Sequence, residues 1–168
     1  MQIAVLFSGG KDSTYAIDWA LKQGHEIKYL LSVKPSRKDC FLFHYATVEH
    51  SKELAGQLGI KHILTGCDVA DPVLEARIVR EVVEKNPVQA VVLGGVGLQE
   101  TQLKSISNAL VSLGVKVFAS HAGQDHGELF KEMLSRGYEI VISQVASAGL
   151  MNWLGKTVTK ENFLLLEA

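Results

Sequence analysis

The residues best suited to chemistry lie in one short segment, Ser8-Gly9-Gly10-Lys11-Asp12-Ser13, between an apolar run and a segment of helical period. Glycines let a chain turn tightly and bring backbone N–H groups close to an anion, and a following helix directs its positive N-terminal end at the same point. Ser8 and Ser13 can add hydroxyl donors, Lys11 a positive charge, and Asp12 a helix cap or a ligand for Mg²⁺ carried by a nucleotide. The segment predicts a phosphate-binding loop. A plain Ser-Gly-Gly turn capped by Asp12 is the alternative.

Two other glycine-containing segments resemble nucleotide motifs but do not match them. The segment 149–157 ends in Gly-Lys-Thr, but five residues separate its glycines where a P-loop needs four. Gly95-Val96-Gly97 continues to Glu100, where a dinucleotide fingerprint requires glycine. Neither a Walker site nor a Rossmann NAD site is therefore expected.

Short apolar runs alternate with segments of helical period along the chain. Strands buried on both faces are continuously apolar, and parallel strands need helical crossovers. The pattern therefore predicts an α/β fold with a doubly wound parallel sheet, in which ligands bind beyond the carboxyl ends of the strands. The expected strands are 3–7, 27–33, 60–65, 90–93, 115–118 and 140–142. Helices are expected from about 12 to 23 and from about 71, and three more are marked by apolar positions within 48–58, 103–113 and 129–134.

Two segments of this pattern have no clear secondary structure. A long polar loop is expected from Pro35 to about Phe43, and loops of that length usually have a function. The segment 148–168 is compatible with loop, short helix or edge strand. Its Phe163-Leu164-Leu165-Leu166 run is either a core strand or an exposed patch, and an exposed patch would favour a homodimer.

Composition limits the class of protein. The chain has 168 residues, 47% hydrophobic and 21% charged, with a formal net charge of -1. These values are typical of one globular domain over 1–168. The balanced charge argues against a nucleic-acid partner. The sequence contains no run of 18 apolar residues, which argues against a membrane-spanning segment. A cytoplasmic protein is therefore expected. Cys40 and Cys67 have neither zinc-site nor disulfide-framework spacing.

The segment SGGKDS at 8–13 resembles the PP-loop of the ATP pyrophosphatase superfamily, whose fold is a Rossmann-like (HUP-type) three-layer sandwich. Further segments narrow the resemblance to the diphthine-ammonia ligase family, over about residues 1–158. These are Gly24-His25-Glu26, the Phe43-His44 pair, 145–150, and Trp153-Leu154-Gly155-Lys156.

The resemblance implies an enzyme that uses ATP with Mg²⁺ to adenylate a carboxylate and ammonium to amidate it, with release of pyrophosphate and AMP. Its acceptor would be elongation factor 2 bearing diphthine. The implied catalytic residues are Lys11, Asp12, Ser13 and His44, with 8–13 on the phosphates and Asp12 near the metal. The adenine and ribose side would comprise Ser32, Val33, Gly94 and Gly95, and the acceptor side Gln99, Gly149, Trp153, Gly155 and Lys156. Residues 145–168 would form a C-terminal substrate-side extension of the single domain.

Several segments depart from the pattern of the resembled family. Family members carry Tyr-Gln, then Arg and Glu, after the fourth-strand glycines, whereas 98–104 reads LQETQLK and matches only at Gln99. A tryptophan near the fifth strand is replaced by Phe-Ala-Ser at 118–120, and the chain stops at Ala168, before the family's C-terminal glycine- and glutamate-rich segment. Two alternatives follow: a catalytically reduced ATP-binding accessory or regulatory module, and a sulfur-transfer relative using Cys40 or Cys67.

The histidines differ in the roles that the sequence predicts for them. His44 either contacts phosphate or the adenylated carbonyl, or packs beside its aromatic neighbours with one satisfied hydrogen bond. His121 and His126 lie in a glycine-rich turn and are expected to be solvated.

Overall fold

The computed structural model describes residues 1–43, 48–94 and 99–167. These residues form two compact units, Met1–Ala122 and Gly123–Ala168, and each is described separately. The expected substrate-side extension from residue 145 lies within the second unit.

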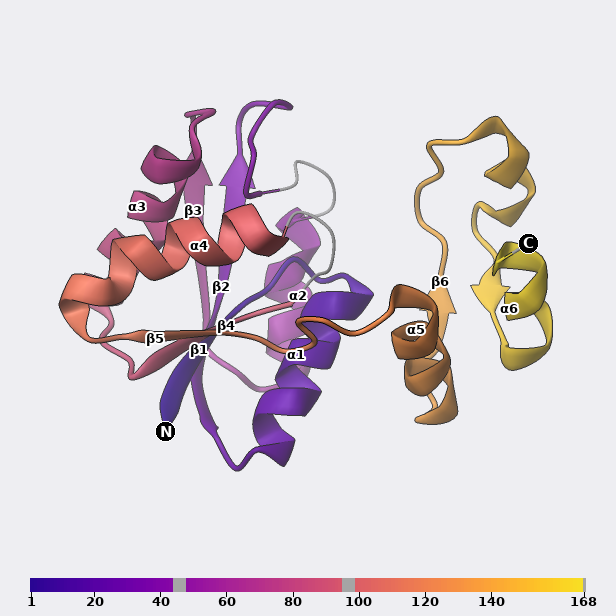
Figure 1. Cartoon of the computed structure of the whole chain (residues 1–168), viewed down its shortest axis with the longest axis horizontal. Coiled ribbons are helices and arrows are strands. Elements are labelled where there is room, and N and C mark those ends of the chain that lie inside the picture. The colour runs from indigo at the N-terminus through magenta and orange to yellow at the C-terminus, as the bar shows by residue number, and fades with distance from the viewer. Residues whose placement is uncertain (44–47, 95–98, 168) are drawn as a thin grey trace. The chain divides into compact units, whose positions relative to one another are not determined.

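The first unit contains a sheet of five parallel strands in the order β3-β2-β1-β4-β5 (Figure 1). The predicted class, an α/β fold with a doubly wound parallel sheet, is confirmed. The sheet reverses its direction of growth between β1 and β4, because β2 lies on one side of β1 and β4 on the other. The strands are β1 (Gln2–Leu6), β2 (Glu26–Pro35), β3 (His62–Cys67), β4 (Ala90–Leu93) and β5 (Lys116–Ala119).

Helices cover both faces of this sheet, which explains why its central strands are apolar throughout (Figure 1). Ile3, Val5 and Phe7 pack with α1 (Lys11–Lys22) and α2 (Ser51–Gln57). Ala4 and Leu6 point to the other face and pack with α3 (Pro72–Lys85) and α4 (Gln99–Leu110). The result is the expected three-layer sandwich.

Local signals explain several element boundaries. The Asp71 side chain accepts hydrogen bonds from the N–H groups of Val73 and Leu74, and Pro72 occupies the first turn of α3. On α1, Trp19 lies with its ring centroid 6.3 Å from that of Phe118 in β5. Two short 3₁₀ segments, η1 (Val48–His50) and η2 (Val111–Leu113), precede α2 and follow α4.

The second unit contains α5 (His126–Ser135), β6 (Ile140–Val141), η3 (Ala148–Trp153), β7 (Thr157–Val158) and α6 (Lys160–Glu167). β6 pairs antiparallel with β7 in a sheet of two strands, so the apolar run 140–142 does not extend the parallel sheet. The predicted alternatives for 148–168 all occur within it, as 3₁₀ helix, short strand and α-helix.

The apolar run Phe163–Leu166 lies in α6, so the core-strand alternative is wrong. Phe163 is buried and stacks on Phe130 of α5, with ring centroids 5.0 Å apart. Leu164 and Leu165 remain 65% and 72% exposed.

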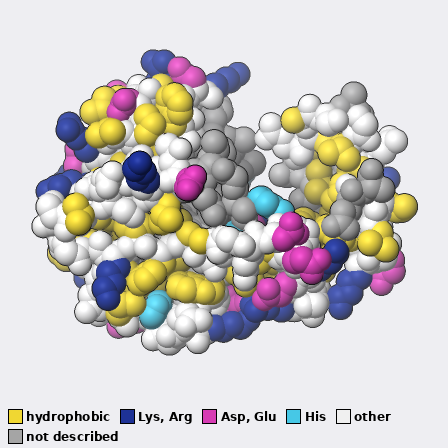
Figure 2. Space-filling view, in the orientation of Figure 1, with side chains coloured by type: hydrophobic (Ala, Val, Ile, Leu, Met, Phe, Trp, Pro, Cys, Tyr) yellow, Lys and Arg dark blue, Asp and Glu magenta, His cyan; other side chains and the backbone are white. Residues whose placement is uncertain are grey.

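The surface mixes side chains of both charges. On the face of the first unit in Figure 2, lysine and arginine side chains are dispersed among acidic ones. Within the described ranges, no helix combines the length and the hydropathy needed to cross a bilayer.

Candidate functional site

The Ser8–Ser13 loop lies between β1 and α1, where the sheet changes its direction of growth. Gly94 directly follows β4, the neighbour of β1 in the sheet. In open α/β sheets, ligands bind in the crevice outside the carboxyl ends of the strands at such a switch point. The topology therefore places the predicted phosphate loop where this architecture binds ligands.

At the N-terminus of α1, several backbone N–H groups have no acceptor within the described residues. Its N-cap is Gly10, which has no side chain to cap the first turn, and Gly9 adopts a φ of 82°. Within the described ranges, no group accepts a hydrogen bond from the N–H of Gly9, Asp12 or Ser13. In contrast, Asp71 caps α3 and Asp125 caps α5. The start of α1 therefore offers N–H groups and a positive dipole end to an anion.

The two serine hydroxyls of the loop hold its shape. The Ser13 hydroxyl donates to the carbonyl oxygen of Gly10 at 2.9 Å, which uses its one proton. It therefore accepts from the Ser8 N–H and the Ser8 hydroxyl, both at 3.3 Å. Because Ser13 is only 3% exposed, this network positions the loop, and Ser8 is the more accessible hydroxyl.

Lys11 and Asp12 form an ion pair, with the ammonium nitrogen 2.7 Å from a carboxylate oxygen of Asp12. About a third of each side chain is exposed, so the pair contributes little to stability, and an incoming anion can compete for the lysine. Within the described residues, no three His, Cys, Asp or Glu side chains gather as metal ligands. A Mg²⁺ ion at Asp12 would therefore take most of its oxygen ligands from a bound nucleotide and water.

Gly94 packs against the first turn of α1. A Cβ atom at this position would lie 2.4 Å from the carbonyl oxygen of Asp12 and 2.6 Å from the Cα of Ser13. The space that a side chain would need is therefore filled by the backbone of the loop-bearing helix. The absence of a side chain at Gly94 allows β4 and α1 to approach closely, and this close approach sets the position of the loop.

The predicted adenine-side residues Ser32 and Val33 are buried in β2 beside the carboxyl end of β1. The Ser32 hydroxyl donates to the carbonyl oxygen of Phe7 at 2.5 Å, immediately before the Ser8–Ser13 loop. A direct hydrogen bond thus joins β2 to the residue that precedes the loop.

His62 of β3 completes this network, although no sequence motif marks it as a site residue. Its Nε2 atom lies 2.8 Å from the Ser32 hydroxyl and 3.2 Å from that of Ser51. Both hydroxyls donate their protons to backbone carbonyl groups, so Nε2 carries the hydrogen and donates. Burial, and then Lys52, lower the pKa of His62, which favours the neutral ring.

The loop after β2 is held by two further side chains that no sequence motif marks. Glu75 of α3 is fully buried, and its carboxylate accepts the N–H groups of Phe41 and Leu42 at 2.9 and 2.7 Å. The Gln102 amide of α4 donates to the Leu42 carbonyl oxygen at 2.6 Å. For Glu75, the only signal in the sequence was its place four residues after Asp71, the N-cap of α3.

Three predicted residues cannot be placed fully in the site. His44 and Gly95 lie outside the described residues. Gln99 is the first residue of α4.

The predicted acceptor residues of the second unit lie close together in sequence and space. The Lys156 ammonium lies 5.9 Å from the centroid of the half-buried Trp153 ring. Gly155 adopts a φ of 76°, and its N–H donates to the Ile142 carbonyl oxygen at 2.8 Å. Gly149 is exposed, with no atom near the position of a Cβ. The cluster presents an aromatic face, a cation and exposed backbone.

The expectation for His121 is wrong, whereas His126 is exposed as predicted. His121 is 2% exposed, and its Nδ1 atom lies 2.7 Å from the Ser120 hydroxyl. Tyr15 of α1 packs against it edge-on, with ring centroids 5.6 Å apart. Ser120 and His121 are thus buried, whereas residues 122–126 of the same segment are exposed.

Comparisons with known proteins add independent findings. The family model described as the diphthamide synthase N-terminal domain matches residues 1–117. Proteins named diphthine–ammonia ligase from Homo sapiens and Mus musculus are each 25% identical over 190 residues, which cover 99% of this chain and 71% of theirs. The protein of that name from Schizosaccharomyces pombe is 24% identical over 187 residues, covering 99% of this chain and 30% of its own.

Among solved structures, a protein from the universal stress protein family of Burkholderia pseudomallei aligns with a TM-score of 0.42 and 13% identity. The alignment covers 70% of this chain and 93% of that one.

Proposed function

Because this chain belongs to the diphthamide synthase N-terminal domain family, we propose that it is an ATP-dependent ligase that joins ammonia to the carboxylate of diphthine. In the proposed reaction, the carboxylate attacks the α-phosphorus of ATP and pyrophosphate leaves. Ammonia then displaces AMP from the acyl adenylate. The acceptor is elongation factor 2 bearing diphthine, and the reaction takes place in the cytoplasm.

The observation that carries this proposal is the uncapped start of α1 at the switch point of the sheet. The N–H groups of Gly9, Asp12 and Ser13 have no acceptor in the described part of the chain. They can bind the pyrophosphate end of ATP without breaking an existing hydrogen bond, so binding costs little reorganisation.

Each polar residue of the loop has a distinct task in the proposal. Lys11 leaves its partner Asp12 to neutralise negative charge that grows on the departing pyrophosphate. Asp12 is then available for Mg²⁺, which would supply further charge neutralisation when bound with ATP. The Ser8 hydroxyl turns from Ser13 to donate to a phosphate oxygen, while Ser13 maintains the turn through Gly10.

We assign adenine recognition to the backbone of Ser32 and Val33. The hydrogen bond from Ser32 to Phe7 holds this part of β2 against the start of the loop, so that both ends of one nucleotide can be positioned together. His44, Gly95 and Gln99 are proposed contributors to the same site. Gly149 and the Trp153–Lys156 pair are proposed to contact the acceptor.

A catalytically reduced ATP-binding module is the second candidate. It is favoured by the departures at Leu98, Gln102 and Lys104 from the resembled family, and by the use of the Gln102 amide to hold Leu42. Such a module would bind ATP through the same loop and release no AMP.

The test is analysis of nucleotide products from the full chain with ATP, Mg²⁺, ammonium and diphthine-bearing elongation factor 2, each omitted in turn. The ligase requires AMP only in the complete mixture. Lys11→Ala should lower AMP formation by at least about a hundredfold. Lys22→Ala is the matched control, because Lys22 pairs with Asp18 at the far end of the same helix. Bound but uncleaved ATP in every mixture would reject the ligase in favour of the binding module.

A further inference from the structure

The structure brings together two thiols that lie far apart in the sequence. Cys40 lies in the loop after β2, and Cys67 is the last residue of β3. Their Sγ atoms are 4.0 Å apart, and both lie near the carbonyl oxygen of Val69, at 3.2 and 3.4 Å. The proposed ligase reaction uses neither thiol.

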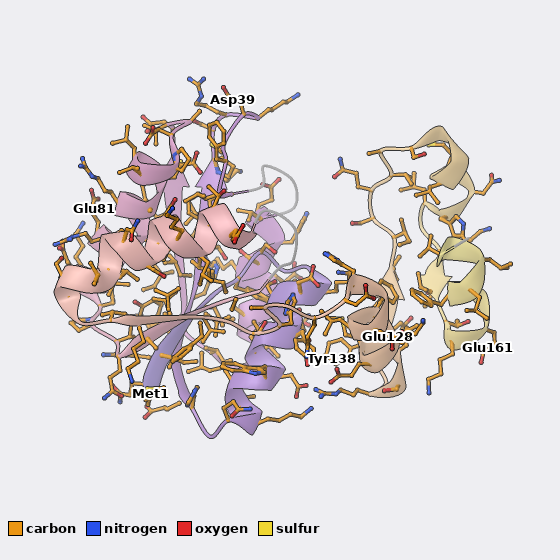
Figure 3. The ribbon with its side chains drawn as sticks, viewed as in Figure 1. Met1, Asp39, Glu81, Glu128, Tyr138 and Glu161 are labelled. Atoms are coloured by element: carbon orange, nitrogen blue, oxygen red, sulfur yellow. The ribbon has the colours of Figure 1, made fainter. Side chains whose placement is uncertain are left out.

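We propose that Cys40 and Cys67 form a reversible intramolecular disulfide that fastens the loop after β2 to the end of β3. This modification site is independent of the proposed ligase activity. Figure 3 shows Asp39 in this loop, beyond the end of the sheet that lies opposite Met1. The cross-link would therefore act at the carboxyl edge of the sheet, where the Ser8–Ser13 loop also lies.

Backbone hydrogen bonds on both sides of Cys40 hold its segment of the loop. The Ser36 N–H donates to the Cys67 carbonyl oxygen at 2.7 Å, before Cys40 in the chain. After it, Phe41 and Leu42 donate to the buried Glu75 carboxylate. A disulfide requires a sulfur separation of about 2.05 Å, so the sulfur atoms must approach by about 2 Å. The proposal requires that rotation of the two side chains and adjustment of the loop around Cys40 provide this movement.

The proposed reaction is thiol–disulfide exchange with glutathione disulfide as the oxidant. Cys40 is the more exposed thiol, and Cys67 is only 3% exposed. The Cys40 thiolate attacks glutathione disulfide, forming a mixed disulfide and releasing one glutathione. The Cys67 thiolate then attacks the Cys40 sulfur and releases the second glutathione. The protein loses two electrons and two protons, and the glutathione disulfide gains them as two thiols.

The surroundings of Cys40 predict how fast the pair responds. Burial, and then Cys67, Glu75 and Asp39, raise the pKa of Cys40 to about 11. Only roughly one Cys40 in ten thousand is therefore a thiolate at neutral pH. We expect the rate of cross-linking to rise about tenfold per pH unit between pH 7 and pH 10. The site would respond to sustained oxidation and resist brief exposure.

The test is to incubate the reduced full chain, without denaturant, in glutathione buffers of increasing oxidised fraction, and then to block free thiols and measure the intact mass. The expected product has lost two hydrogen atoms and gives a peptide joining Cys40 to Cys67 in a non-reducing digest. Dithiothreitol should restore the starting mass. Cys67→Ser should stop at a glutathione adduct on Cys40, whereas Cys40→Ser should remain largely unmodified.

Three results would overturn the proposal. These are a folded wild-type chain that only gains glutathione, a disulfide that forms only in denaturant, and a disulfide that joins two chains. The wild-type mass decides the question even if one of the serine variants fails to fold.

Discussion

Replacing Gly94 by alanine tests the structural basis of the phosphate loop directly. The new Cβ would lie 2.4 Å from the Asp12 carbonyl oxygen, 2.6 Å from the Ser13 Cα and 2.7 Å from the Asp12 carbonyl carbon. All three are backbone atoms, so no flexible side chain can move aside. The contact with Asp12 must open to at least 3.0 Å, which moves α1 away from β4 or bends the end of the strand.

The cost can be worked from this geometry. Overpacking of this kind costs about 1–3 kcal/mol, and the lower entropy of an unfolded chain with alanine returns about 0.4–1 kcal/mol. We expect the free energy of unfolding to fall by about 1–2 kcal/mol. The same shift displaces the N–H groups at the start of α1, so the affinity for ATP should fall by about tenfold or more.

The assay combines urea unfolding, followed by far-ultraviolet circular dichroism, with calorimetric titration of ATP. Gly66→Ala in β3 is the matched control, because nothing lies within 4 Å of the position of its Cβ and its φ is not positive. It should leave both the unfolding midpoint and the ATP affinity close to wild type. If Gly94→Ala behaves like Gly66→Ala, close packing of β4 on α1 does not position the loop.

Two further predictions concern buried polar groups. Glu75→Gln should lower the free energy of unfolding by about 1–3 kcal/mol, because its amide NH₂ must face one of the two backbone N–H groups now bound to the carboxylate. Urea unfolding measures this change, with the exposed Glu81→Gln as the control. Wild-type stability in both variants would contradict the prediction. Because the pKa of His62 is lowered in the folded state, the unfolded chain takes up that proton first, so stability should fall as the pH decreases below its ordinary value of 6.5. His62→Gln keeps an N–H donor but does not titrate, so its stability should depend less on pH between 4.5 and 7; an unchanged dependence would exclude His62 as the source.

Elements with strong local signals could be predicted from the sequence. The strand at 90–93 is observed as β4 at Ala90–Leu93, and the Asp71-Pro72 pair marks the start of α3 as expected. Both depend on neighbouring residues: a short buried run in one case, and a side-chain cap followed by proline in the other. The position of the Ser8–Ser13 loop at the carboxyl end of a strand could also be predicted, because alternating strands and helices place the carboxyl ends of parallel strands at the same end of the sheet.

Features that depend on contacts between distant segments could not be predicted. Glu75 meets Leu42 from 33 positions away, and Cys40 meets Cys67 from 27. Apolar periodicity indicates which face of a helix is buried, but not which backbone group a polar residue on that face will meet. His121 illustrates the converse: its polar, glycine-containing neighbours predict exposure, but its side chain is buried and packs edge-on against Tyr15 of α1.

The position of the tryptophans has a practical consequence. The chain has two, and one lies in each compact unit: Trp19 beside Phe118 in the first, and Trp153 beside Lys156 in the second. Each indole is therefore an intrinsic fluorophore for its own unit. Trp19→Phe would leave emission from the second unit, and Trp153→Phe emission from the first. Melting curves of these two variants would give separate transition temperatures for the phosphate-loop unit and the C-terminal unit without any added label.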